Sequence, residues 1–248
     1  MGHENNEKIQ DQGIYIKKDE KVTWAENFWY HYKWAIIGIA VAAVILFVCI
    51  VQSCTKREED ILIVYAGPAY LSQTELASVV EVMGNTMPRD FDENGDKFVI
   101  VDMFQIFSEE QIKDITAQTD ANGKQGYVDR SRNSSNYDQY NKYVLTGDSS
   151  IYLLDPFLYE TLKTNDRLCK LTDVLSDEPK GAIDEYGVRL GDTDLYKEYG
   201  VLRVLPEDTV ICIARPFVAG TKTSKEKYYN REKEMFSAIV DTPLKTED

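Results

Sequence analysis

The pattern of hydrophobic and polar positions divides the chain at one uninterrupted apolar segment. From Trp34 to Val51 the sequence reads WAIIGIAVAAVILFVCIV, without a charged or strongly polar residue. As a helix this segment would be about 27 Å long, close to the thickness of the hydrocarbon core of a bilayer. A helix on the surface of a soluble protein would carry polar residues on the face that meets water. The segment therefore predicts a transmembrane helix over residues 34–53.

Aromatic residues crowd the N-terminal side of this segment: Trp24, Phe28, Trp29, Tyr30, Tyr32 and Trp34. Amphipathic rings favour the interface between membrane and water. Thr23 and Glu26 have the spacing of a capping box, which predicts a helix that begins near Trp24. We therefore expect residues 1–33 to form a tail that ends in an aromatic juxtamembrane helix.

Basic residues near the apolar segment predict its orientation. Four lysines precede it, and only Lys56 and Arg57 follow it; the four are Lys17, Lys18, Lys21 and Lys33. The positive-inside rule then places the N-terminus in the cytoplasm and the C-terminal part outside. The 33 residues before the segment are more than an ordinary cleaved signal peptide carries, which favours an uncleaved signal anchor in a single-pass cell-membrane protein.

After a linker at residues 54–59, the pattern changes to that of a folded domain over residues 60–248. Short apolar runs predict four buried strands, and capping boxes or an Asp-Pro start predict helices between them. The predicted strands are Ile61–Ala66, Phe98–Phe104, Ile151–Leu154 and Val210–Ala214. The alternation predicts an α/β domain with a mixed, mostly parallel sheet and flanking helices. We expect residues 58–248 to fold on their own.

Helix boundaries follow from local signals. Ser72 with Glu75 predicts the start of a helix that ends at Gly84, Ser108 with Gln111 the start of a short one, and Thr223 with Glu226 the start of the last one. A helix with Tyr137, Tyr140 and Val144 on one face is expected, and another begins at Asp155-Pro156. The polar stretch from Thr119 to Ser135 is expected to be a loop.

Two passages of the domain resemble a known family. LTGDSSIYLLDPFLYETL (145–162) and VICIARPFVAGTKTSKEKYYNREKEMFSAIV (210–240) are similar to passages of bacterial type II extracellular solute-binding proteins. WYHYKW before a single span resembles uncharacterised membrane-anchored proteins of Gram-positive bacteria that carry such ectodomains. Binding proteins of this type usually have two full lobes in a longer chain. The resemblance therefore implies the fold in a shortened form, and no ligand-contact motif carries over residue by residue.

Charge and composition exclude several functions. The formal net charge is −14, and residues 58–248 alone carry 36 acidic and 21 basic residues, which argues against nucleic acid as a partner. The two histidines, His3 and His31, precede the apolar segment. The outer domain therefore has neither a histidine-dependent nucleophile nor a histidine zinc site, and the sequence contains no phosphate-binding glycine loop. We expect no catalytic residues and no cofactor.

One stretch, DFDENGD, copies the first half of a calcium-binding loop. Asp90, Asp92 and Asn94 occupy its first, third and fifth positions, and Gly95 allows the sharp turn. Position twelve, where a bidentate Glu belongs, is Val101. The same residues are typical of a polar Asn-Gly turn before a strand. Metal binding is therefore the weaker hypothesis, and its candidate ligands are Asp90, Asp92, Asn94 and Asp96.

Cysteines and tyrosines leave alternatives open. Cys169 and Cys212 form a disulfide or stay as buried thiols, and Cys54 is an acylated cysteine or an ordinary interfacial one. The tyrosines at 137, 140, 143 and 152 line a cleft or, as their helical spacing favours, pack in the core.

Two functional hypotheses follow. The first is a membrane-anchored, non-catalytic binding or scaffold module outside the cytoplasm, held by the lipid bilayer and contacting a small solute or an envelope protein. The second is an exported carboxylate-dependent hydrolase that acts on envelope glycans. A hydrolase of this kind needs a pair of carboxyl groups about 5–10 Å apart in a deep cleft.

Overall fold

A computed structural model describes residues 24–55, 59–119, 123–215 and 222–241. The chain divides into two compact units, Met1–Arg57 and Glu58–Asp248. Each unit is described by itself.

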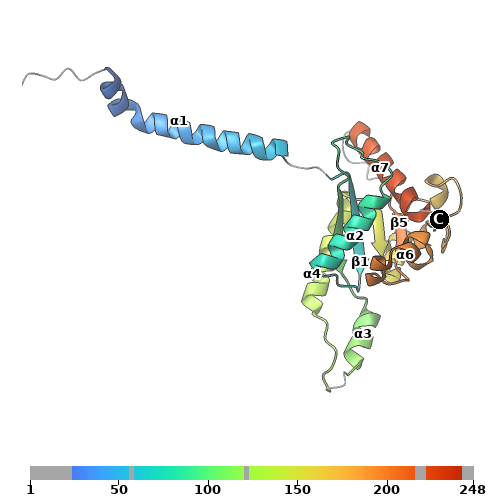
Figure 1. Ribbon diagram of the computed structural model, residues 1–248. Helices are drawn as coiled ribbons and strands as arrows, with labels where there is room; N and C mark the ends of the chain where they lie inside the picture. Colours follow the sequence, from blue (N-terminus) through green and yellow to red (C-terminus); the bar gives the residue numbers. More distant parts are fainter. Residues whose placement is uncertain (1–23, 56–58, 120–122, 216–221, 242–248) are drawn as a thin grey trace, which may run out of the picture. The chain divides into compact units, whose positions relative to one another are not determined.

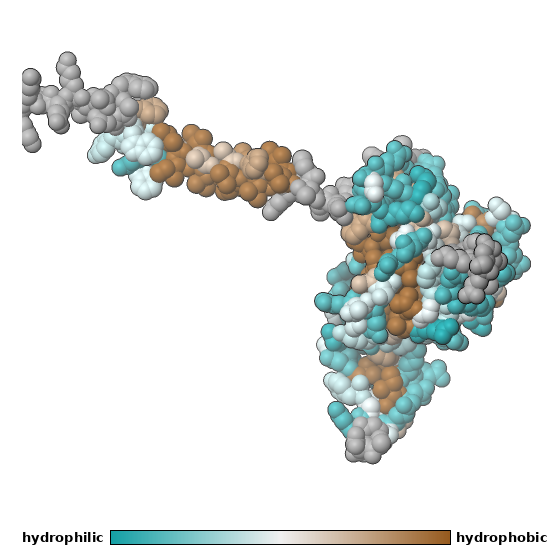
Figure 2. Space-filling view, in the orientation of Figure 1, coloured by the Kyte–Doolittle hydropathy of each residue, from teal (hydrophilic) through white to brown (hydrophobic). Residues whose placement is uncertain are grey.

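The described part of the first unit is one helix, α1 (Trp24–Thr55) (Figure 1), and Thr23 of the predicted capping box lies outside the described residues. Its segment Phe28–Val51 is long and apolar enough to cross a membrane, judged by length and composition. The large apolar side chains exposed along this segment have between 43% and 76% of their surface accessible. Figure 2 shows the helix as a hydrophobic rod beyond its paler, aromatic N-terminal end. No protein surface within the described residues covers this rod.

The second unit is built on a five-stranded sheet with the order β2-β1-β3-β5-β4. Its strands are β1 (Ile61–Gly67), β2 (Val99–Gln105), β3 (Ile151–Leu154), β4 (Gly187–Arg189) and β5 (Val210–Ile213). Strand β1 pairs in parallel with β2 and β3, whereas β5 is antiparallel to both of its neighbours. The domain is thus α/β with a mixed sheet, as the alternation of elements predicted.

Helices cover both faces of this sheet. The α-helices described in this unit are α2 (Gln73–Thr86), α3 (Glu109–Ala117), α4 (Arg130–Thr146), α5 (Pro156–Thr164), α6 (Asp194–Glu198) and α7 (Lys222–Asp241). Side chains of α2, α6 and α7 pack with the sheet in one core, and side chains of α4 and α5 form a second core on the opposite face. Burial on both faces explains why β1, β3 and β5 are apolar throughout.

Three helix starts form as the sequence predicted. In the capping boxes of α2 and α3, the Ser72 and Ser108 hydroxyls accept from the backbone N–H of Glu75 and Gln111, and these side chains bond back to the serine N–H. Asp155 accepts from the N–H of Phe157 at 3.1 Å, with Pro156 in the first turn of α5. These local signals are strong because each cap satisfies N–H groups that no helical carbonyl can reach.

Other boundaries differ from the prediction. The loop expected up to Ser135 ends earlier, because the Asp129 carboxylate accepts from the N–H of Arg132 at 3.1 Å and starts α4 at Arg130. Helix α2 continues past Gly84 to Thr86. Helix α7 already includes Lys222, ahead of the expected cap.

Candidate functional site

The acidic stretch that resembles a calcium loop lies between α2 and β2, at the amino end of the sheet. The Asp90 carboxylate accepts from three backbone N–H groups, those of Asp92 at 3.2 Å, Glu93 at 2.9 Å and Gly95 at 2.7 Å. The Gly95 N–H bond contributes most to holding the pKa of Asp90 below its ordinary value. Gly95 has a φ of 99°, a conformation that favours glycine. The loop therefore folds around an ionised Asp90.

A residue that the sequence did not single out completes this loop. Asp60, 1% exposed, accepts from the N–H groups of Phe91 and Asp92 at 3.2 and 3.1 Å, and from that of Phe98 at 3.1 Å. One carboxylate oxygen from each of Asp60, Asp90 and Asp92 lies within 4.8 Å of the other two. Sequence spacing could not reveal Asp60, because the parallel pairing of β1 with β2 brings it to this loop from 30 positions away.

The predicted ligands do not all converge. Asp90 and Asp92 lie together, while the Asn94 side chain is directed into the turn: its Nδ2 donates to Asp92 at 2.6 Å and its Oδ1 accepts from the N–H of Asp96 at 2.9 Å. Neither Asn94 nor Asp96 belongs to the three-carboxylate group. Val101 is buried in β2 and has no ligand atom to offer. Three carboxylates that already accept N–H bonds are a poor match for a cation that takes six to eight oxygens.

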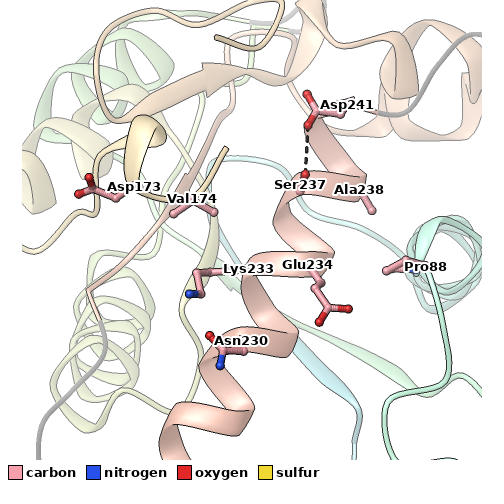
Figure 3. Close-up of a pocket in the computed structure, with 9 residues that line it drawn as sticks. All are labelled: Pro88, Asp173, Val174, Asn230, Lys233, Glu234, Ser237, Ala238 and Asp241. Atoms are coloured by element: carbon pink, nitrogen blue, oxygen red, sulfur yellow. Dashed lines mark hydrogen bonds between the residues drawn. The ribbon is translucent and has the colours of Figure 1, made fainter. Parts of the chain in front are cut away.

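The largest of the described depressions lies along α7 and has a volume of about 710 Å³. We call it the α7 depression. It is lined by Pro88, Asp173, Val174, Asn230, Lys233, Glu234, Ser237, Ala238 and Asp241 (Figure 3). It is open to solvent, and six of its nine lining residues are polar or charged. Small-molecule sites are usually enclosed and largely apolar, so the shape is better suited to contact with a macromolecular surface.

A second depression of about 350 Å³ shares Asn230 and Glu234 with the first. Arg89 forms a bidentate ion pair with Glu234, at 3.0 and 3.1 Å, and its guanidinium lies 4.8 Å from the centre of the Phe91 ring. The segment after α2 is thereby fixed against α7. Together these contacts give the exposed face of α7 a defined shape.

A third depression, of about 340 Å³, lies at the carboxyl end of β2 and includes Phe107, Ile115 and Tyr127. Its amide groups already bond within the chain. The Asn133 side chain pairs with both the N–H and the carbonyl of Phe107, at 2.8 and 3.0 Å, and Asn136 donates to the Gln105 carbonyl at 2.8 Å. These side chains bond to the backbone at the end of the edge strand β2. Their hydrogen bonds therefore give them a structural role and do not indicate a ligand.

Asp155 lies at the carboxyl end of β3, an edge where open α/β sheets often bind ligands. Burial raises its pKa, while the N–H of Phe157 and the Gln111 side chain, at 2.8 Å, both donate to its carboxylate. Its oxygens thus cap α5 and fix α3.

The cysteines and tyrosines have structural positions. Cys169 and Cys212 are free, and they pack in the cores on opposite faces of the sheet, which keeps the two thiols apart. Burial raises the pKa of Cys212, so its thiol is unreactive. Tyr140 and Tyr152 pack edge to face with ring centroids 6.3 Å apart. The Cys54 side chain lies outside the described residues.

We compared the chain with protein-family models, curated protein sequences and solved structures. No protein-family model, curated protein sequence or solved structure matches the chain.

We predict that Asp60→Ala lowers the free energy of unfolding by about 3 kcal/mol, because three backbone N–H groups lose their acceptor in a buried position. Urea denaturation of the purified protein, followed by circular dichroism, measures this. Glu81→Ala, at an exposed position of α2, should change stability by less than about 0.5 kcal/mol. An Asp60→Ala effect as small as that of the control would show that the N–H groups find other acceptors.

We also predict that the dissociation constant for calcium is larger than about 10⁻⁴ M, where the weaker-binding extracellular calcium modules begin, because the bidentate ligand is missing. Calorimetric titration of the purified protein tests this, together with elemental analysis for bound metal. Asp90→Asn is the matched control and should leave the titration unchanged. Stoichiometric calcium, or tighter binding that Asp90→Asn removes, would make the three carboxylates a metal site.

Proposed function

We propose that this protein is a membrane-anchored binding module. In this proposal α1 spans the cell membrane with its N-terminus in the cytoplasm, and the acidic α/β domain outside binds a protein partner of the cell envelope without catalysing a reaction. The exposed apolar surface of α1 and the lysines before it support the anchor and its orientation.

The observation that carries the binding role is the architecture of the domain. All five named strands belong to one sheet, so the described residues form a single lobe without a cleft between two sheets. The depressions along its surface are open and polar. A single lobe with such surfaces favours a macromolecular partner over the enclosure of a small solute. The likeness to solute-binding ectodomains then concerns the fold and not solute capture.

The alternative, a carboxylate-dependent hydrolase, has less support. A general acid needs a raised pKa, and burial raises the pKa of two acids in the domain, Asp155 and Glu232. Glu232 bonds to Ser150 before β3, and Asp155 follows β3. Ser150 and Asp155 are five positions apart in extended chain, about 17 Å, whereas the two carboxyl groups of a glycosidase lie about 5–10 Å apart. Neither acid lines the α7 depression.

We predict that the exposed face of α7 contacts the partner. A photo-cross-linking amino acid at Asn230, in the full-length protein in intact cells, should give a discrete protein adduct. The matched control is Gln139, exposed on α4 at the opposite face of the sheet, which should give none. Adducts of the same pattern from both positions would contradict this surface, and the absence of any adduct would favour a small solute.

A further inference from the structure

Helix α7 is fixed to the amino ends of two strands by polar side chains one turn apart. Glu232 is 2% exposed, and its Oε1 accepts from the N–H of Ser150, directly before β3, at 2.5 Å. The Tyr228 hydroxyl lies beside the backbone N–H of Leu62 in β1. The Ser149 hydroxyl donates to the Leu62 carbonyl at 2.6 Å. The segment of α7 from Tyr228 to Glu232 is thus placed against the strands in one buried contact region.

Glu232 has no counter-charge there. No salt bridge to Glu232 forms within the described part of the chain. The titratable groups that interact with it are Tyr228 and Tyr229 on α7 and Tyr152 on β3. Burial raises the pKa of each of these tyrosines, so all three are neutral near pH 7.

The charged groups around this region do not compensate Glu232 either. Arg231 lies 6.0 Å from the centre of the Phe91 ring, and Arg167 donates to the Val144 carbonyl. Lys233, the next residue, has its Nζ 5.2 Å from the centre of the Tyr229 ring and forms no salt bridge with Glu232 within the described part of the chain. The other charged groups that act on the surrounding tyrosines are acids: Glu59, Asp148 and Asp173. An ionised Glu232 would therefore be a buried and unpaired anion, which is costly.

We propose that Glu232 is a proton-controlled latch: while protonated it holds α7 against the amino ends of β1 and β3, and its ionisation makes local opening of the helix more frequent. The inference goes beyond the proposed function and does not depend on it. Helix α7 also carries Asn230, Lys233 and Glu234 of the α7 depression. Opening of the latch would therefore change that surface.

The direction of the pH effect follows from burial, which raises the pKa of Glu232 from 4.5 to about 7. A raised pKa means that the folded state binds the proton more tightly than the open state. The latch therefore stabilises α7 fully below the ordinary pKa of glutamate, and this contribution is lost as the pH rises through about 7. For an open state with an ordinary glutamate, the opening equilibrium increases about tenfold between pH 6 and pH 8.

Hydrogen exchange of the full-length protein in detergent micelles tests the latch. After correction for intrinsic exchange rates, protection of peptides covering residues 226–241 should fall about tenfold between pH 6 and pH 8. Protection of α4, which packs on the opposite face of the sheet, should stay constant. Unchanged protection of α7, or an equal fall in α4, would overturn the proposal.

Two variants separate the carboxyl group from other effects of pH. Glu232→Gln keeps an oxygen for the Ser150 N–H but cannot ionise, so α7 protection should not depend on pH. Glu226→Gln, at an exposed position of the same helix, should behave like the wild type. A wild-type pH response in Glu232→Gln would overturn the latch. If Glu232→Gln does not fold, the wild-type comparison of α7 with α4 decides the matter.

Discussion

Apolar side chains must be removed from water, and this requirement explains the architecture of both units of this protein. Removing a large aliphatic side chain from water is worth about 1.5–3 kcal/mol. In the domain the sheet meets this need with helices on both faces. Along α1 more than a dozen large apolar side chains have no protein cover within the described residues, which corresponds to more than about 10 kcal/mol. A lipid bilayer would remove this cost, which is the physical basis of the proposed membrane anchor.

The amino end of the sheet shows how a buried carboxylate can be accommodated. Asp60 accepts three backbone N–H groups and organises the loop before β2. Glu232, at the same end of the sheet, has the Ser150 contact but no cation. The first arrangement supports a fixed acidic turn, whereas the second gives a contact that depends on protonation.

Much of the fold was predictable because its signals are local. Apolar runs marked β1, β3 and β5, and the capping boxes at Ser72 and Ser108 marked two helix starts. Short-range patterns could not predict β4, a three-residue strand in a turn-rich stretch, or the start of α4 within a polar one. The candidate loop was found, but Asp60 joins it through strand pairing, and Glu232 is buried through packing of α7. Both depend on contacts between distant segments.

The central claim is that α1 holds the domain outside the cell membrane with its N-terminal tail inside. Treatment of intact cells with an external protease tests it most directly, with antibodies against each end of the chain. The account predicts that the domain after residue 58 is degraded while the tail with Lys17 and Lys18 is retained, and that the tail becomes accessible only after the membrane is permeabilised. Protection of the domain in intact cells, or cleavage at Lys17 or Lys18 from outside, would contradict it.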